Sequence, residues 1–397
     1  MSPQLRRFRF AAPARWTVGL AVALGAAVLG LSLEAHSPPK ALPDRLSDND
    51  FWHLVTSMSE PGGYFRSDNF VSNEMSFQAV VPALAQLAPP GGVYLGVGPE
   101  QNFTYIVALK PRIAFVFDIR RQNMLELLLY KALIEQAHDR ADFLALLFVR
   151  SRPDGFDSTT SADSLFAAFA RAAPDSVLFT STLAAVERRL LGQHHFKLSQ
   201  TDLSRIAYVY TAFFLQGPTL SYSFSSPPRW GFGHMMPTYA ELMTATDGQG
   251  HERSYLATEA DFRELKRLED ANLIVPLVGD FAGKKAIRAV AHYLKGHGAT
   301  VTAFYTSNVE QYLFRQGDDW RKFYANVGTL PLQENSAFIR AIFNFGGFWY
   351  RDPADPNRRP GPRSVTVLSP IADQLLAVAD GRIESYYDLI EASLGTR

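Results

Sequence analysis

Short apolar runs alternate with helix-like runs in two parts of the chain, and this alternation limits the possible fold more than any other feature of the sequence. In the first part, the apolar runs Val93–Val97 and Ile113–Phe117 are separated by the helix-like run Phe103–Leu109. The turn signal Pro89–Gly92 precedes the first apolar run, and a long helix-like run, Arg120–His138, follows the second. Apolar runs of this length between turn residues predict strands buried on both faces, as in a parallel sheet covered by helices.

The same alternation returns in the C-terminal part of the chain. The expected strands there are Leu273–Val278, Ala299–Tyr305 and Phe338–Phe345, and the expected helices are Lys284–Gly296, Ile371–Ala379 and Arg382–Ala392. Residues from about 150 to 270 lack this rhythm and are expected to form a mostly helical insertion with a loop-rich tail. Strands that alternate with helices predict a doubly wound α/β fold, which we place at residues 51–397 with the insertion inside it.

Composition excludes several classes of function. Of the 397 residues, 47% are hydrophobic and 20% are charged, which is the composition of a folded chain rather than a disordered one. Lys+Arg and Asp+Glu each number 39, and without a net positive charge nucleic acid is not expected as the main partner. The absence of cysteine excludes disulfides, thiolate metal sites and cysteine nucleophiles. The adjacent His194 and His195 have no partner at a useful spacing, so no metal site is expected.

The N-terminal 35 residues are expected to direct the chain to a membrane. Four arginines between residues 6 and 15 precede the uncharged run Trp16–Leu33, which would extend over about 27 Å as a helix. This pattern fits either a cleaved signal peptide or an uncleaved anchor, and it predicts a membrane-anchored or exported chain whose remainder lies on the periplasmic side. Residues 36–50, rich in proline and aspartate, are expected to be a linker.

The first pair of predicted strands carries a pattern typical of a nucleoside site. Gly96 and Gly98 stand at the end of the first strand, where glycine allows a tight turn and a close approach of the backbone to a ligand. Asp118 ends the second strand, and a carboxylate there can accept hydrogen bonds from both ribose hydroxyls. The third glycine of a dinucleotide fingerprint is replaced by Gln101 and Asn102. A nucleoside ligand without a pyrophosphate is therefore expected, and a simple tight turn is the alternative.

Several of these segments resemble a known enzyme family. Val93–Ile106 together with Asp118 resembles the first two motifs of class I S-adenosylmethionine-dependent methyltransferases. The loop 279–281 resembles that family's later Gly-Asp loop, and residues 307–312 stand where the family places substrate and methyl-transfer residues. Over residues 50–395, outside the middle of the insertion, the chain is more closely similar to a little-characterised group of bacterial proteins with a methyltransferase-like domain.

The resemblance implies a Rossmann-like, class I methyltransferase-like sheet and S-adenosyl-L-methionine as the cofactor. It also implies that the glycine loop faces the methionine part of the cofactor and that the acid at the end of the second strand binds the ribose. The cofactor-binding residues it implies are Gly96, Gly98, Glu100, Asn102, Asp118, Asp280 and Phe281.

Methyl transfer requires few catalytic groups from the protein, because the sulfonium is already activated and the enzyme mainly aligns the acceptor with the methyl group. A hydroxyl or phenol acceptor is helped by a general base. Glu310 is the expected base, and Asn308 and Tyr312 are expected to orient the acceptor. Arg120 and Arg121, just past the second strand, are expected either to brace the site or an anionic substrate, or to lie on a solvated helical turn.

Two functions stay open at this level. The first is an S-adenosylmethionine-dependent methyltransferase-like enzyme acting on an unknown small or lipid-associated acceptor. The second is a non-enzymatic, exported or membrane-anchored binding protein that retains the fold, since the N-terminal signal places the domain where S-adenosylmethionine is not normally supplied. A nicotinamide or another nucleotide in the same loop is less favoured, because the third glycine is missing.

Overall fold

Residues 40–87, 91–223, 236–343 and 364–395 are described in the computed structural model of the protein. All of them belong to one folded unit, Lys40–Arg397. The predicted signal peptide or anchor, residues 1–35, lies outside the described residues, and so does the apolar helix expected within it. In the ranges that are described, no helix is both long enough and apolar enough to cross a bilayer.

Six strands form one sheet in the order β3-β2-β1-β4-β5-β6. They are β1 (Val93–Val97), β2 (Ile113–Asp118), β3 (Ile274–Val278), β4 (Val301–Ser307), β5 (Leu332–Phe343) and β6 (Ser364–Pro370). The first five pair in parallel, and β6 pairs antiparallel with β5. Every residue of β1, β2 and β3 is buried, which explains why these strands are near-continuous apolar runs. The predicted mixed α/β architecture with a mostly parallel sheet is confirmed, and it is consistent with a Rossmann-like fold.

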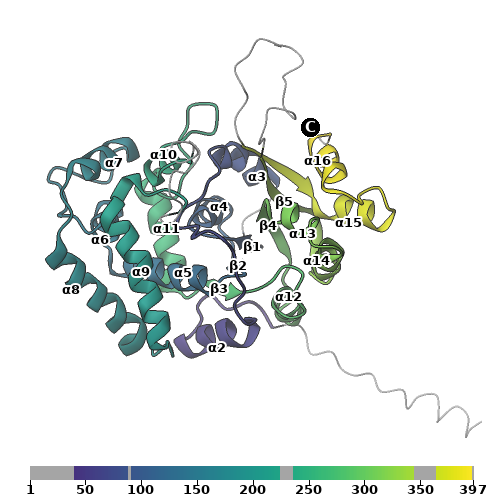
Figure 1. Ribbon diagram of the computed structural model, residues 1–397, viewed down its shortest axis with the longest axis horizontal. Coiled ribbons are helices and arrows are strands. Elements are labelled where there is room, and N and C mark those ends of the chain that lie inside the picture. Colours follow the sequence, from purple (N-terminus) through teal and green to yellow (C-terminus); the bar gives the residue numbers. More distant parts are fainter. Residues whose placement is uncertain (1–39, 88–90, 224–235, 344–363, 396–397) are drawn as a thin grey trace, which may run out of the picture. The chain divides into compact units, whose positions relative to one another are not determined.

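Helices cover both faces of the sheet (Figure 1). On one face lie α4 (Gln101–Leu109), α5 (Arg121–Gln136) and α11 (Glu259–Asp270), and on the other lie α12 (Ala286–Gly296), α13 (Val309–Leu313) and α14 (Asp319–Val327). The remaining helices outside the insertion are α2 (Asp48–Met58), η1 (Phe77–Val80), α3 (Val81–Leu87), α15 (Ile371–Ala379) and α16 (Tyr386–Leu394). Because the connections from β1 to β3 cover one face and those from β3 to β5 the other, the strand order reverses between β1 and β4.

The insertion between β2 and β3 is built from helices. They are α6 (Arg140–Phe148), α7 (Ala162–Arg171), α8 (Ser176–Glu187), η2 (Arg188–Gln193), α9 (Gln200–Gln216), η3 (Gly217–Thr219) and α10 (Tyr239–Met243). α9 packs along α5, and α6 and α8 pack on α9, so the insertion forms a layer outside the helices that touch the sheet (Figure 1). These helices occupy much of the expected range 150–270, and α6 precedes it.

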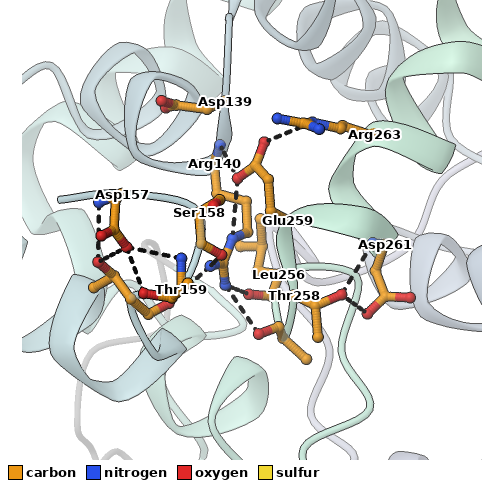
Figure 2. A network of polar contacts seen from close by, with 12 residues as sticks. Asp139, Arg140, Asp157, Ser158, Thr159, Leu256, Thr258, Glu259, Asp261 and Arg263 are labelled. Atoms are coloured by element: carbon orange, nitrogen blue, oxygen red, sulfur yellow. Dashed lines mark hydrogen bonds and ion pairs between the residues drawn. The ribbon is translucent and has the colours of Figure 1, made fainter.

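A buried arginine joins the two ends of this insertion (Figure 2). Arg140 begins α6, and its guanidinium donates to the carbonyl oxygens of Leu256 at 2.8 Å and Thr160 at 2.7 Å. Glu259 at the start of α11 supplies the opposite charge, 3.3 Å from Arg140 Nε. A guanidinium is buried at tolerable cost only when its donors are paired in this way. The network holds the segment before α11 against α6 and so positions the helix that leads into β3.

The structure departs from the expected elements mainly at β5, at β6 and at the start of the folded unit. β5 begins at Leu332 rather than at residue 338, and the sequence pattern did not indicate β6, an edge strand that mixes hydroxyl and apolar residues. The expected linker 36–50 overlaps α2, and the chain packs on the unit before that helix begins. Leu42 and Leu46 are buried, and Leu46 N–H donates to the carbonyl of Ala271 at 3.0 Å. The folded unit therefore starts earlier than residue 51.

Candidate ligand site at the strand ends

A cavity of about 180 Å³ lies at the carboxyl ends of the central strands. The last residues of three strands line it: Val97 of β1, Asp118 of β2 and Ser307 of β4. The irregular segment between α2 and α3 also contributes to its wall, through Tyr64 and Glu74 among others. The cavity thus occupies the point where the strand order reverses, which is the usual ligand position in doubly wound sheets.

One amide side chain holds the glycine loop that follows β1. Asn102 Nδ2 donates to the carbonyl oxygens of Val97, Gly98 and Pro99 at 2.7–3.2 Å, and Asn102 Oδ1 accepts from Tyr94 Oη at 2.9 Å. Asn102 is fully buried and does not line the cavity. The expected cofactor contact by Asn102 is therefore replaced by a role in shaping the loop.

The two predicted glycines serve different purposes. A Cβ on Gly96 would lie 1.8 Å from Asn102 Oδ1 and 2.8 Å from the Tyr94 ring, so this glycine is required by packing behind the loop. Gly98 lines the cavity with φ +80°, and a Cβ there would meet nothing within 4 Å. That backbone conformation is adopted without strain mainly by glycine. Gly98, but not Gly96, is thus placed to let a ligand approach the backbone.

Glu100 also lies behind the loop rather than in the cavity. The side chain is fully buried, and its Oε1 accepts from Ser72 N–H at 3.3 Å. Burial raises the pKa of Glu100 to about 8, so the carboxyl is mostly neutral at pH 7. The expected contact between Glu100 and the cofactor is not what this geometry offers.

Asp118 lines the cavity, as expected of a ribose-binding acid, but it is already engaged. Its Oδ1 accepts from Arg120 N–H at 2.7 Å and Arg120 Nε at 3.0 Å, and its Oδ2 accepts from Arg120 Nη2 at 2.9 Å. Arg120 also donates to the carbonyl oxygens of Ser67 and Asp68. A carboxylate has about four acceptor positions, so about one remains for a ligand hydroxyl while Arg120 stays in place.

The loop after β3 brings Asp280 and Phe281 to the cavity wall. Glu60 fixes this loop, because its carboxylate accepts from the backbone N–H of Asp280 at 2.8 Å and of Lys285 at 2.7 Å. The Phe281 ring stacks on Phe304 of β4 with centroids 5.5 Å apart. Burial raises the pKa of the Asp280 carboxyl. Asp280 and Phe281 of the predicted Gly-Asp loop therefore line the same cavity as Gly98 and Asp118, although a long insertion separates the two pairs in the sequence.

The segment after β4 divides its side chains between the cavity and the core. Asn308, Val309 and Tyr312 line the cavity. Positions 309 and 312 lie on one face of the short helix α13, as helical periodicity requires. Glu310 lies on another face and does not reach the cavity. The three residues expected to act together are therefore separated into two groups.

Glu310 belongs to a buried ion pair. Arg340 of β5 donates from Nε to Glu310 Oε2 at 2.7 Å and from Nη2 to Oε1 at 3.0 Å, and Tyr324 Oη donates to Oε1 at 2.6 Å. The side chains of Glu310 and Arg340 are 2% and 3% exposed. A general base must reach the proton that it removes, and Glu310 faces away from the cavity. The geometry thus assigns Glu310 to the core and does not support the expected role as base.

Glu74 is an acidic residue of the cavity that sequence reasoning missed. It is 1% exposed; its Oε1 accepts from Tyr305 Oη at 2.8 Å and from Ser307 Oγ, and its Oε2 accepts from Gln101 Nε2 at 2.9 Å. Burial raises the pKa of Glu74, and these hydrogen bonds offset part of that rise. Across the described ranges, no ion pair is formed with its carboxylate. Glu74 lies in an irregular segment, where neither periodicity nor a motif could indicate it.

Charge on the cavity wall is unbalanced. Among the described residues that line it, Glu74, Asp118 and Asp280 carry carboxylates, and Arg120 carries the only cationic side chain. That arginine is already paired with Asp118. An excess of carboxylates favours a cationic ligand and disfavours a pyrophosphate.

Histidine and carboxylate side chains do meet elsewhere in the unit. His194 lies between Asp48 and Glu135, with Nδ1–Oδ1 and Nε2–Oε2 distances of 2.8 and 2.7 Å. These partners lie far from His194 in the sequence, so spacing gave no sign of them. Over the part of the chain that the structure describes, no group of three or more His, Asp or Glu side chains is arranged to hold a metal ion.

The comparisons with known proteins add a family but no activity. The search of curated proteins gives no match. A family model described as "Domain of unknown function (DUF7790)" matches residues 69–190 and 154–357, which include the glycine loop, Asp118, Asp280 and the segment after β4. Because these matched ranges cover more than half of the chain, the protein belongs to the family described as Domain of unknown function (DUF7790).

Proposed function

We propose that the cavity binds S-adenosyl-L-methionine and that the protein is a methyltransferase-like enzyme acting on a small or lipid-associated acceptor. In this proposal the sheet is the class I methyltransferase-like form of a Rossmann-like fold, and the N-terminal 35 residues anchor the domain to a membrane or export it to the periplasmic side. Support comes from the motif resemblance and from the position of Gly98, Asp118, Asp280 and Asn308 around one cavity.

The observation that carries the proposal is the charge of the cavity wall. S-adenosylmethionine has a sulfonium and an ammonium against a single carboxylate, so it is a cation, whereas a dinucleotide brings an anionic pyrophosphate. Glu74, Asp118 and Asp280 outnumber Arg120 among the described lining residues. Electrostatic complementarity therefore favours the sulfonium cofactor over a nicotinamide dinucleotide.

Each lining group has a role in this proposal. Glu74 lies between α4 and the end of β4, where its buried carboxylate neutralises the cationic methionine part of the cofactor. Asp118 accepts from a ribose hydroxyl, and a second hydroxyl bonds to it when Arg120 gives up one of its hydrogen bonds. Asn308 and Tyr312, which follow the carboxyl end of the neighbouring strand β4, orient the acceptor. The protein thereby aligns an acceptor with an already activated methyl group.

Calorimetric titration of three variants tests this assignment. Asp118→Ala and Glu74→Gln should each weaken binding of S-adenosylmethionine by about tenfold or more, since a charge-assisted hydrogen bond is worth about 1.5–3 kcal/mol. Asp163→Ala, an exposed acid in the first turn of α7, is the matched control and should bind like the wild type. Wild-type affinity in both Asp118→Ala and Glu74→Gln would remove these residues from the site.

A binding protein without turnover is the second candidate. It is favoured by the position of Glu310, because the residue expected to act as base is held in an ion pair outside the cavity. The two candidates differ in whether bound S-adenosylmethionine is consumed. Formation of S-adenosylhomocysteine during incubation with a panel of hydroxyl, amine and carboxylate acceptors supports the enzyme, and tight binding with no product from any of them supports the binding protein.

A further inference from the structure

A second pocket, of about 370 Å³, adjoins the cavity and has the opposite charge. Four arginines line it, namely Arg66, Arg120, Arg121 and Arg205, and we call it the arginine pocket. It shares Tyr64, Phe65 and Arg120 with the cavity, so the two spaces lie side by side. The arginines come from the irregular segment after α2, the start of α5 and the second turn of α9, which no sequence motif links.

Two of these arginines are fixed from behind by carboxylates. Arg120 is bidentate on Asp118, as described above, and Arg121 donates from Nε and Nη2 to the two oxygens of Asp202 at 2.7 and 2.9 Å. Asp202 in turn belongs to the capping box that begins α9. Bidentate pairing holds a guanidinium plane in one orientation. The wall of the arginine pocket is thus ordered before any ligand arrives.

The other two arginines have no carboxylate within ion-pair distance in the described chain. Arg66 and Arg205 are exposed and form no ion pair with any described residue. One carboxylate, that of Asp68, also lines the pocket and accepts from Tyr208 Oη at 3.1 Å and Ser223 Oγ at 2.7 Å, so the arginines of the lining outnumber its acidic residues. Cations around a pocket of this size lie within about one Debye length of one another, about 8 Å at physiological salt. Their mutual repulsion is relieved by an anion placed between them.

We propose that the arginine pocket binds the oxyanion of the methyl acceptor, a phosphate or carboxylate group carried by a small molecule or by a lipid headgroup. The role of this ligand as a methyl acceptor rests on the proposed function, and the arginine pocket adds the chemical class of that acceptor. Arginine forks match the geometry of these oxyanions. The cationic cofactor then binds among the carboxylates of the cavity, and the oxyanion of the acceptor binds among the arginines of the arginine pocket.

The boundary between the two spaces is aromatic, which suits an acceptor with an apolar or aromatic body. Phe65 lines both spaces, and its ring meets Tyr312 edge-on with centroids 5.3 Å apart. Tyr64, at the same boundary, is 85% exposed. An acceptor held by its oxyanion at the arginines passes over Phe65 and presents its other end to Asn308 in the cavity.

Calorimetric titration of the full-length chain with inorganic phosphate tests the arginine pocket without any need for the cofactor. The wild type should bind phosphate, and the double variant Arg66→Ala/Arg205→Ala should bind at least tenfold more weakly, with S-adenosylmethionine affinity unchanged. Arg188→Ala, an exposed arginine of the insertion that lines neither space, is the control and should keep wild-type phosphate affinity. Equal phosphate affinity in all three proteins, or no binding by the wild type, overturns the proposal.

The same variants separate this inference from the proposed function. Phosphate binding that depends on Arg66 and Arg205, together with no S-adenosylmethionine binding, keeps the oxyanion site and rejects the cofactor. Binding of S-adenosylmethionine without binding of phosphate keeps the cofactor assignment and rejects the oxyanion site.

Vesicles identify the source of the oxyanion. Binding to phosphatidylcholine vesicles that contain phosphatidic acid, lost in Arg66→Ala/Arg205→Ala and absent with phosphatidylcholine alone, supports a lipid headgroup. Binding of free phosphate with no arginine-dependent binding to either vesicle supports a soluble acceptor. Vesicle binding that is the same in the double variant and the wild type counts against the arginine pocket as a lipid site.

Discussion

Replacing Glu310 by Gln should destabilise the fold without changing ligand binding. The substitution removes the charge that faces Arg340, whose side chain is 3% exposed, while nearly preserving side-chain size. Breaking a buried ion pair by removing one partner costs about 3–5 kcal/mol. The unfolding entropy is about 2.1 cal/mol/K per residue, which over the roughly 360 residues of Lys40–Arg397 gives about 0.75 kcal/mol/K. The expected fall in Tm is therefore about 4–7 °C.

Differential scanning calorimetry measures the Tm, and isothermal titration measures affinity for S-adenosylhomocysteine. The double variant Glu310→Met/Arg340→Met is the control, because replacing both members of a buried pair by apolar side chains is often nearly neutral. It should recover most of the Tm lost in Glu310→Gln. An unchanged Tm in Glu310→Gln, combined with a tenfold loss of affinity, would refute the structural role and return Glu310 to the binding site.

Three further predictions concern the loop and the buried acids. Gly96→Ala should lower the Tm strongly, since its Cβ would lie 1.8 Å from Asn102 Oδ1. Gly98→Ala would place its Cβ in open space, so it should cost only about 1–2 kcal/mol of backbone strain while weakening cofactor binding. Equal Tm losses in calorimetry for the two variants would contradict this difference. Burial raises the pKa of Glu100 from 4.5 to about 8, so the folded state holds a proton that the unfolded state releases, and stability falls as pH rises from 4.5 to 8. Urea unfolding should show that Glu100→Gln removes up to about 5 kcal/mol of this fall, at 1.36 kcal/mol per pKa unit, and parallel pH profiles would be the contrary result. The raised pKa of Glu74 predicts that affinity for S-adenosylmethionine increases with pH above the ordinary range of a glutamate, and that Glu74→Gln flattens this dependence in pH-resolved titrations.

The central strands were predictable because a strand that is buried on both faces is a short, nearly continuous run of apolar residues. β1 and β2 are apolar runs between turn residues, and the structure places them at nearly the predicted residues. The first part of β5 and the whole of β6 show no such run, because β5 begins with exposed polar residues and β6 lies at the sheet edge. The packing of Leu42 and Leu46 was hidden in the same way, since two leucines in a Pro- and Asp-rich segment form no periodic pattern.

The candidate site was predictable only where its residues lie at strand ends. Gly98 and Asp118 were identified from the glycine and acid pattern at the ends of two predicted strands, and Asp280 from the motif resemblance. The three residues lie together because the carboxyl ends of parallel strands meet at one edge of the sheet. Glu74 and Arg205 are brought to that edge by an irregular segment and by an insertion, so tertiary packing alone reveals them. Conversely, cofactor contacts were expected for Glu100 and Asn102, but the hydrogen bonds of these side chains hold them behind the glycine loop.

Titration of the full-length wild-type chain with S-adenosylmethionine, S-adenosylhomocysteine and NAD tests the central claim most directly. The cavity charge and the loop geometry predict micromolar binding of the first two ligands and no measurable binding of NAD. Binding of NAD in preference to S-adenosylmethionine, or binding of none of the three, would contradict the assignment of this cavity to a sulfonium cofactor.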